Sequence, residues 1–194
     1  GSDLTRIQDG VNKHRPGYDL TFSAPKSVSM LAMLGGDKRL IDAHNRAVTV
    51  ALNQVESLAS TRVKKDGVSE TVLTGNLIIA RFNHDTSRAQ DPQIHTHSVV
   101  INATQNGDKW QMLASDTVGK TGFSETILAN RIAFGKIYQN SLRADVESMG
   151  YKTVDAGRNG MWQMEGVPVE SFSTRSQELL EAAGPDASLK SRDV

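Results

Sequence analysis

The sequence predicts an α+β fold with one central antiparallel sheet, and three observations lead to this prediction. Two long stretches carry apolar residues at alternating three- and four-residue spacing, which is the pattern of amphipathic helices. Other stretches are rich in Val, Ile and Thr without that spacing, which favours strands. Short turns rich in Gly, Asn and Asp join several of these stretches, and strands joined by short turns pair antiparallel.

The first predicted element is a short strand over 19–22, where polar and apolar residues alternate. Ser23 and Pro25 then mark the start of a helix, whose apolar stripe stops at the two glycines of 35–36. A long amphipathic helix is predicted over 38–64, because its apolar residues keep helical spacing. This part of the chain therefore alternates between strand and helix.

The middle of the chain is predicted to be mostly strand. A turn at 65–67 leads into a strand over 70–84, which a Gly-Asn pair interrupts at 75–76. A second long strand is predicted over 95–105, and the Asn-Gly-Asp sequence of 106–108 is typical of a hairpin turn. These strands supply the central sheet.

The last part of the chain closes that hairpin and adds a second long helix. A strand over 109–113 completes the hairpin, and a helix follows over 125–149 and ends before Gly150. A small hairpin over 151–164 and a helix over 169–183 are predicted next. Neither repeats nor low-complexity linkers divide these elements, so we expect a single domain.

The composition limits the chemistry that the chain can perform. The 194 residues include no cysteine, which excludes disulfides, thiolate zinc sites and a cysteine nucleophile. Any metal must therefore be bound by His, Asp or Glu. The formal net charge of zero argues against a protein that coats nucleic acid without specificity. No apolar run is as long as a membrane span and no signal peptide is evident, so we expect a cytoplasmic protein.

Three histidines form the pattern with the strongest chemical meaning. His95 and His97 alternate with Thr96 in a predicted strand, so their side chains point to one face about 7 Å apart. His84 ends the preceding strand, and the ten residues between it and His95 are few enough to return the chain antiparallel. Three converging imidazoles could bind a divalent cation that polarises a phosphate.

Other interpretations of the histidines stay open at this point. Strand histidines are often simply packed or solvated. A cupin-like His-x-His site would want a carboxylate soon after the pair, but 98–102 reads Ser-Val-Val-Ile-Asn. His14 and His44 are expected in a loop and on a helix surface, respectively, without a functional role.

Long segments of the chain closely resemble one protein family, the MobF conjugative relaxases, whose F-type members are relaxase-helicases. The likeness is carried by GYDLTFSAPKSVS at 17–29 and FNHDTSRAQDPQIHTH at 82–97, and it continues in TGNLIIARFNHDTSR, VGKTGF, GMWQM and the final ASLKSRDV. The resemblance implies an HUH endonuclease fold, a palm-like antiparallel sheet with long helices packed on one face. It also implies that residues 1–194 form a relaxase domain.

The resemblance implies a specific activity and a specific site. Such proteins bind single-stranded DNA of a plasmid transfer origin and nick and rejoin one phosphodiester through a covalent 5′-phosphotyrosine. His84, His95 and His97 match the family's metal ligands, with Mg²⁺ or Mn²⁺ as the expected cation. Asp19 matches a buried acid beside the site, whose expected role is to orient a histidine or to accept the tyrosine's proton.

The chain departs from the family pattern in its tyrosines. The family's nucleophilic tyrosines lie near the natural N-terminus, upstream of the matched segments, and no Tyr-Tyr pair occurs here. We therefore expect the nucleophile to be missing from this chain, since Tyr18, Tyr138 and Tyr151 do not match it. The helicase region that the resemblance places downstream is expected to be absent as well.

Several residues are predicted to contact DNA. Arg131 and Gln139 lie on one helix face with Gly135 between them, and Arg and Gln are side chains that read bases. A solvated helix face would explain the same pattern. Four cations within the matched motifs could contact phosphates: Lys26, Arg88, Lys120 and Arg192. The family further implies accessory relaxosome proteins and a coupling protein as partners, and transfer with the DNA into the recipient cell.

Two other functions compete with the relaxase interpretation. Without a nucleophile the chain would be a DNA-binding module that recognises the transfer origin but does not nick it. A small histidine-metal hydrolase or oxygenase would instead use an activated water and form no covalent DNA adduct.

Overall fold

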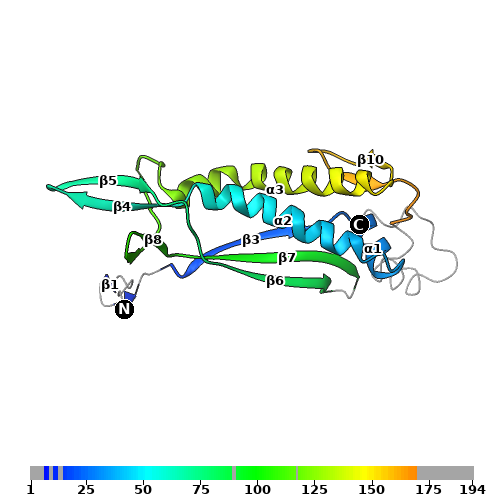
Figure 1. Ribbon diagram of the computed structural model, residues 1–194, viewed down its shortest axis with the longest axis horizontal. Helices are drawn as coiled ribbons and strands as arrows, with labels where there is room; N and C mark the ends of the chain where they lie inside the picture. The colour runs from blue at the N-terminus through cyan, green and yellow to red at the C-terminus, as the bar shows by residue number, and fades with distance from the viewer. Residues whose placement is uncertain (1–6, 9–10, 13–14, 89–90, 117, 170–194) are drawn as a thin grey trace, which may run out of the picture. The chain divides into compact units, whose positions relative to one another are not determined.

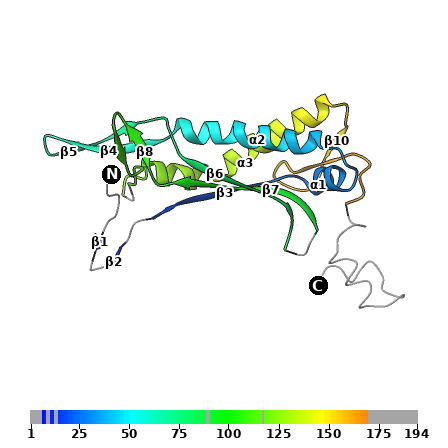
Figure 2. The ribbon, with the colours of Figure 1, turned by 60° about the horizontal axis from the view of Figure 1, so that its bottom comes forward.

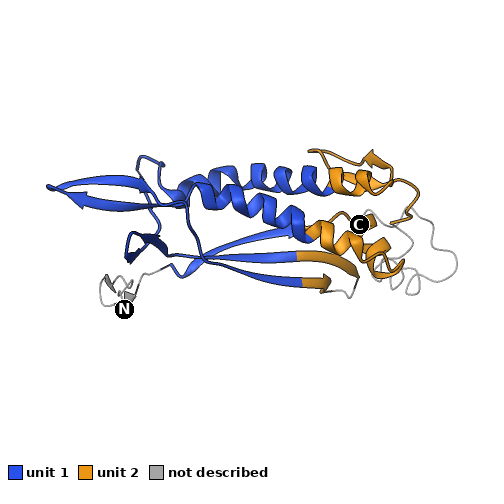
Figure 3. Cartoon of the chain, viewed as in Figure 1, with its two compact units in different colours: residues 1–22, 45–83, 96–142 blue, residues 23–44, 84–95, 143–194 orange. Residues whose placement is uncertain are grey.

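The computed structural model describes residues 7–8, 11–12, 15–88, 91–116 and 118–169. The chain divides into two compact units, coloured separately in Figure 3. The first unit contains 1–22, 45–83 and 96–142, and the second contains 23–44, 84–95 and 143–194.

The first unit is built on a three-stranded sheet. Its strands are β3 (Gly17–Ser23), β7 (Pro92–Ile101) and β6 (Ile79–Thr86), in the order β3-β7-β6. Buried residues alternate with more exposed ones along β3 and β7, as expected for strands that cover a core with one face. A Cβ atom at Gly17 would lie 2.5 Å from the backbone oxygen of Val100, so glycine allows β3 to approach β7 this closely.

Two long helices cover one face of this sheet in the first unit (Figures 1 and 2). They are α2 (Arg39–Ser57) and α3 (Phe123–Ser148). The ring of Phe22 on β3 lies 5.4 Å from the ring of Tyr138 on α3. On the α2 side, Arg81 Nη1 of β6 donates a hydrogen bond of 2.7 Å to Thr49 Oγ1. The predicted α+β architecture, with long helices on one face of a sheet, is thus confirmed.

The predicted helix over 38–64 is too long, because α2 ends at Ser57 and a strand replaces its last turns. That strand, β4 (Ser60–Lys65), pairs antiparallel with β5 (Val68–Leu73). Asp66 and Gly67 join them with φ values of 49° and 81°, the left-handed pair that a two-residue hairpin turn requires. The pairing with β5 outweighs the helical spacing of the apolar residues before it.

The predicted interruption at 75–76 is confirmed, and a side chain explains it. Gly75 has φ 66°. Asn76 uses its amide as a bridge to the next segment: Oδ1 accepts from the backbone N–H of Gln105 at 2.7 Å, and Nδ2 donates to the backbone oxygen of Gln105 at 2.8 Å. The chain therefore breaks between β5 and β6 to make these bonds instead of a continuous ladder.

Two small hairpins complete the first unit as far as the structure describes it. The predicted strand over 95–105 ends at Ile101, and β8 (Thr104–Asn106) pairs antiparallel with β9 (Lys109–Gln111) around Gly107, as the turn signal predicts. Near the start of the chain, β1 (Ile7–Gln8) pairs with β2 (Val11–Asn12).

The second unit holds a short helix and a small hairpin. These are α1 (Lys26–Met33), which follows Pro25, and β10 (Thr153–Asp155) with β11 (Trp162–Met164). Helix and hairpin are joined through Ser27, whose backbone N–H donates to Gln163 Oε1 at 3.0 Å and whose hydroxyl accepts from the Met164 N–H at 2.8 Å. Both elements agree with the sequence prediction.

His44 lies in the second unit and corrects one expectation. It was predicted on a helix surface, but only 1% of it is exposed. It continues the buried stripe of α2 because Leu40, four residues earlier, is fully buried too. The helix predicted over 169–183 falls outside the described residues except at Val169, and among the described helices none is long and apolar enough to cross a membrane.

Candidate functional site

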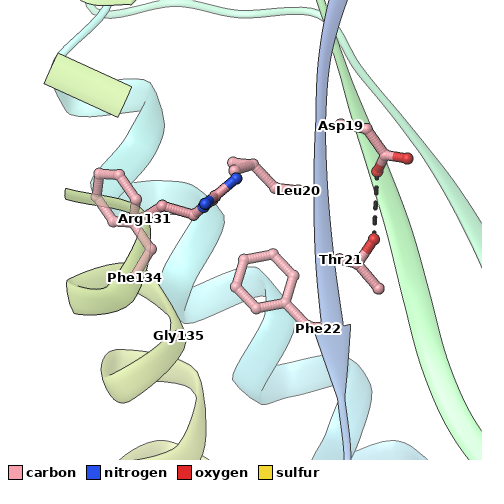
Figure 4. A pocket seen from close by; sticks show the side chains of 7 residues that line it. All are labelled: Asp19, Leu20, Thr21, Phe22, Arg131, Phe134 and Gly135. Carbon is pink, nitrogen blue, oxygen red and sulfur yellow. Dashed lines mark hydrogen bonds between the residues drawn. The ribbon is translucent and has the colours of Figure 1, made fainter. Parts of the chain in front are cut away.

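The candidate site in the first unit lies on the face of the sheet that the helices leave open. Asp19 and Thr21 point away from the side of β3 that carries Leu20 and Phe22 (Figure 4). This follows from alternation along β3, where Leu20 and Phe22 are buried and Asp19 and Thr21 are exposed. His97 is half-buried between two buried neighbours on β7, which places it on the corresponding face.

Asp19, Thr21 and His97 form one hydrogen-bonded cluster. His97 Nδ1 lies 3.2 Å from Asp19 Oδ2 and 3.1 Å from Thr21 Oγ1. The Thr21 hydroxyl also lies 3.5 Å from Asp19 Oδ1. Because a carboxylate only accepts hydrogen bonds, this arrangement requires a proton on His97 Nδ1.

The position of Asp19 supports one part of its predicted role and corrects another. A carboxylate on Nδ1 is the usual partner of a metal-binding histidine, so the contact suits the orienting role. The expectation of a buried acid was wrong, because 55% of the Asp19 side chain is exposed. The reason is its place on the open face of the sheet.

The second unit contains the other two predicted metal ligands. The rings of His84 and His95 stack with their centroids 5.1 Å apart and an angle of 17° between their planes. His95 Nδ1 lies 3.0 Å from the backbone oxygen of Gln93. Since a carbonyl oxygen only accepts, His95 also carries a proton on Nδ1.

The donor chemistry of these histidines fits a divalent cation. In both His95 and His97, Nδ1 lies within hydrogen-bond distance of an oxygen acceptor, which is how histidines that bind metal through Nε2 are usually arranged. Within the described ranges, however, no three His, Asp or Glu side chains are gathered so that they could hold a metal ion. Binding of one cation by His84, His95 and His97 therefore stays a prediction.

A polar network that sequence reasoning missed ties the strands that carry these histidines. Thr96, fully buried, donates from Oγ1 to Asn83 Oδ1 at 2.8 Å. Asn83 Nδ2 in turn donates to Asn45 Oδ1 on α2 at 3.3 Å. All three residues belong to the first unit, so these bonds hold β6, β7 and α2 together there, next to His97 in the chain. The only signal of this network in the sequence was the position of Thr96, a hydroxyl residue between two histidines.

The three tyrosines all make contacts within the fold. Burial raises the pKa of Tyr138, of which 1% is exposed. Tyr151 donates its hydroxyl to Asp37 Oδ2 at 2.5 Å, which raises its pKa. The Tyr18 hydroxyl is hydrogen-bonded to Ser124 Oγ, and its ring packs edge-on against Phe123. Because a raised pKa disfavours the phenolate that attacks phosphorus, Tyr138 and Tyr151 are poor nucleophiles, and the Tyr18 hydroxyl is already bonded to Ser124.

Arg131 lies on the side of β3 that faces α3, opposite the side to which Asp19 and Thr21 point (Figure 4). It lines a cavity of about 220 Å³ together with Phe134 and Gly135 of α3 and the β3 segment 19–22 (Figure 4). A Cβ atom at Gly135 would meet nothing within 4 Å, so this part of the helix is open to close approach. Gln139, two turns further along α3 from Arg131, is half-buried.

The remaining predicted DNA contacts are spread over the chain. Lys120 is exposed before α3 in the first unit, with φ 55°. In the second unit, Lys26 is the half-buried first residue of α1, and Arg88 is exposed in the turn after β6. Arg192 lies outside the described residues.

Comparisons with known proteins agree with one family. The family model described as TrwC relaxase matches residues 1–192. The multifunctional conjugation protein TraI of Escherichia coli is 73% identical over all 194 residues, although the chain spans only 11% of that relative's length.

Solved structures of relaxases resemble the chain over almost all of its length. The conjugative relaxase TrwC in its metal-bound complex with oriT DNA is 35% identical, with a TM-score of 0.78 over 98% of this chain and 66% of its own. TrwC with a 27-mer DNA that comprises the recognition hairpin and the cleavage site is 34% identical, with a TM-score of 0.79 over 98% and 69%. From its sequence and its fold, the chain belongs to the TrwC relaxase family.

Proposed function

We propose that this chain is the DNA strand-transferase domain of a conjugative relaxase. It binds single-stranded DNA of a plasmid transfer origin and takes part in nicking and rejoining one phosphodiester. Family membership over residues 1–192 supports this proposal, and so do the names of relatives that act in conjugation or were solved with oriT DNA. A neutral net charge favours a confined DNA groove over a broadly basic surface.

We propose that His84, His95 and His97 supply the metal ligands, with Mg²⁺ or Mn²⁺ as the cation. The observation that carries this proposal is that Nδ1 of both His95 and His97 is held by an oxygen acceptor. A divalent cation, when bound, supplies positive charge that stabilises the extra negative charge of a phosphate under attack. The chain's own contribution is to orient the imidazoles, through Asp19 at His97 and through the Gln93 carbonyl at His95.

The proposed reaction is a transesterification. A tyrosine oxygen forms a bond to phosphorus, the bond from phosphorus to the 3′ oxygen breaks, and that oxygen takes up a proton. The reverse reaction rejoins the strand. Because the three tyrosines of this chain are buried or hydrogen-bonded, we propose that the attacking tyrosine belongs to polypeptide other than these 194 residues. Asp19 is exposed enough to accept its proton.

DNA recognition is proposed for the residues singled out in the sequence. Arg131 and Gln139 on α3 are the proposed base-reading residues, and Arg131 is supported by its place in the cavity beside β3. Phosphate contacts are proposed for Lys26, Arg88, Lys120 and Arg192. Accessory relaxosome proteins, a coupling protein, a cytoplasmic location and transfer into the recipient cell are proposed from the family resemblance alone.

A cleavage assay tests the proposed reaction. The 194-residue chain is incubated with labelled single-stranded DNA that carries the transfer origin of the plasmid encoding the 73% identical relative, with Mn²⁺ or with EDTA. A parallel reaction adds a synthetic peptide that spans the tyrosines of that relative. On a denaturing gel we expect binding without cleavage by the chain alone, and Mn²⁺-dependent cleavage with the peptide. A covalent adduct of the chain alone would show that one of its own tyrosines attacks.

Because the three tyrosines are buried or hydrogen-bonded within the fold, one alternative function is a DNA-binding module without nicking activity. It predicts tight binding of the same DNA and no cleavage even when the peptide is present. A histidine-metal hydrolase would instead cleave without any covalent adduct, so the gel distinguishes all three functions.

A further inference from the structure

Thr21 contacts two residues of the proposed site but has no role in the function described so far. Its Oγ1 lies 3.1 Å from His97 Nδ1 and 3.5 Å from Asp19 Oδ1. Thr21 and Asp19 share the open face of β3 because they are two residues apart in a strand (Figure 4). The hydroxyl is therefore part of the cluster that holds His97.

A hydroxyl has the chemistry that this position needs. It can accept a hydrogen bond from the His97 Nδ1–H while it donates its own hydrogen to the Asp19 carboxylate. Asp19 Oδ2 also accepts from the same Nδ1–H at 3.2 Å, so the three groups close a cycle. The branched Cβ of threonine restricts its χ1 rotamers, which keeps the hydroxyl in place.

We propose that Thr21 is a positioning residue for His97. Its hydroxyl fixes the Nδ1–H tautomer and the orientation of the ring, and it holds the Asp19 carboxylate toward that ring, so that Nε2 is presented for metal binding. The metal part of this proposal rests on the proposed function. The tautomer part is a property of the metal-free protein and can be measured independently.

The test compares three variants of the 194-residue chain at position 21 with a matched control. Thr21→Val removes the hydroxyl with little change of shape, and Thr21→Ser keeps it. Thr71→Val makes the same change at an exposed threonine of the β4–β5 hairpin. Thr21→Ala is a second variant without the hydroxyl, in case Thr21→Val does not fold.

The first readout is the tautomer of His97 in the metal-free protein, measured by long-range proton–nitrogen NMR of the imidazole ring. We expect Nδ1–H in the wild type, in Thr21→Ser and in the control. In Thr21→Val and Thr21→Ala we expect a mixture of both tautomers, because the Asp19 carboxylate that accepts from Nδ1–H is no longer held toward the ring by the Thr21 hydroxyl. A His97 that already carries its proton on Nε2 in the wild type would overturn the proposal.

The second readout is the dissociation constant for Mn²⁺. Partners of metal-binding histidines typically contribute about 10-fold or more in metal affinity, so we expect Thr21→Val to weaken Mn²⁺ binding about 10-fold. We expect Thr21→Ser to stay within about twofold of the wild type, since its partner group is retained, and the control to be unchanged.

The two readouts separate failure of this inference from failure of the proposed function. A wild type that binds no Mn²⁺, with a tautomer change in Thr21→Val, would overturn the metal site but support the positioning of His97. Wild-type tautomer and wild-type Mn²⁺ affinity in both hydroxyl-free variants would overturn the role of Thr21 and leave the metal site standing. Equal losses in Thr21→Ser and Thr21→Val would overturn the role of the hydroxyl.

Discussion

Asp19 Oδ2 lies 3.2 Å from Nδ1 of His97, although 78 residues separate the two positions in the chain. The contact joins β3 to β7 on the face of the first unit's sheet that the helices do not cover. It gives a physical basis for the orienting role of Asp19, because a carboxylate bonded to Nδ1 fixes the direction in which the imidazole ring points.

Replacing Asp19 by Asn is therefore expected to weaken metal binding. The amide lacks the negative charge that strengthens the hydrogen bond, so we expect the Mn²⁺ dissociation constant to rise about 10-fold or more. Titration calorimetry measures this constant. Glu70→Gln, which removes one negative charge from the exposed β5 strand, is the matched control. An equal loss of Mn²⁺ affinity in both variants would show that the effect comes from the overall charge of the protein and not from the contact with His97.

Removing the side chain of Asn76 is expected to destabilise the fold. Its amide makes hydrogen bonds to Gln105 N–H, to the Gln105 carbonyl and to the hydroxyl of Thr104, and Asn76→Ala loses all of them. We expect a loss of about 2 kcal/mol in the free energy of unfolding, measured with urea. Asn140→Ala, on the exposed side of α3, should change it by less than about 0.5 kcal/mol. If Asn76→Ala lowered the free energy of unfolding no more than Asn140→Ala does, the hydrogen bonds of Asn76 would contribute nothing to stability.

Removing two buried hydroxyls of β7, one at a time, is expected to change the stability of the fold differently. Among the described residues none hydrogen-bonds to the buried Ser98 Oγ, so Ser98→Ala should leave stability unchanged or raise it by up to about 1 kcal/mol. Thr96 Oγ1 is bonded to Asn83, so Thr96→Val should lower stability by about 1 kcal/mol. Urea unfolding of the two variants side by side checks this, and a loss in Ser98→Ala as large as that in Thr96→Val would contradict the assignment.

The start of α2 is expected to lose stability in acid. Hydrogen bonds from Arg39, and then from the Tyr151 hydroxyl, hold the pKa of the Asp37 carboxyl well below its usual range. The folded state therefore binds fewer protons than the unfolded state below about pH 4, so this stabilisation is present above that pH and is lost as the pH falls further.

Asp37→Asn tests this pH dependence. The variant should be less stable than the wild type at pH 7, and the difference should shrink as the pH is lowered from about 4 toward 2. Denaturant unfolding at a series of pH values measures it, with Asp108→Asn at an exposed turn position as control. A difference that stays constant over this range would contradict the ion pair as its source.

Much of the fold could be predicted because its signals are local. Alternation along 19–22, the Asp66-Gly67 turn and the stripe of α3 each depend on residues near one another in the chain. The end of α2 at Ser57 could not, because the apolar spacing continues into a segment whose partner strand, β5, decides its conformation. A pattern of neighbouring residues does not show whether helix formation or pairing with a distant strand is more favourable.

The candidate site was predictable only in part for the same reason. Alternation in β7 indicates that His95 and His97 share a face, and the family resemblance singles out Asp19. That β3 is the neighbour of β7, so that Thr21 meets His97, depends on a long-range pairing that no local pattern reveals. The same pairing leaves Asp19 exposed where a buried acid was expected.

The central claim is that His84, His95 and His97 bind a divalent cation for DNA strand transfer. The most direct measurement is a Mn²⁺ titration followed by electron paramagnetic resonance, on the wild type and on the three single His→Ala variants, with His14→Ala as control. We expect one bound Mn²⁺ per wild-type chain, an unchanged affinity in the control, and an affinity at least about 10-fold weaker in each of the three variants. Wild-type affinity in the three variants, or no bound Mn²⁺ in the wild type, would contradict it.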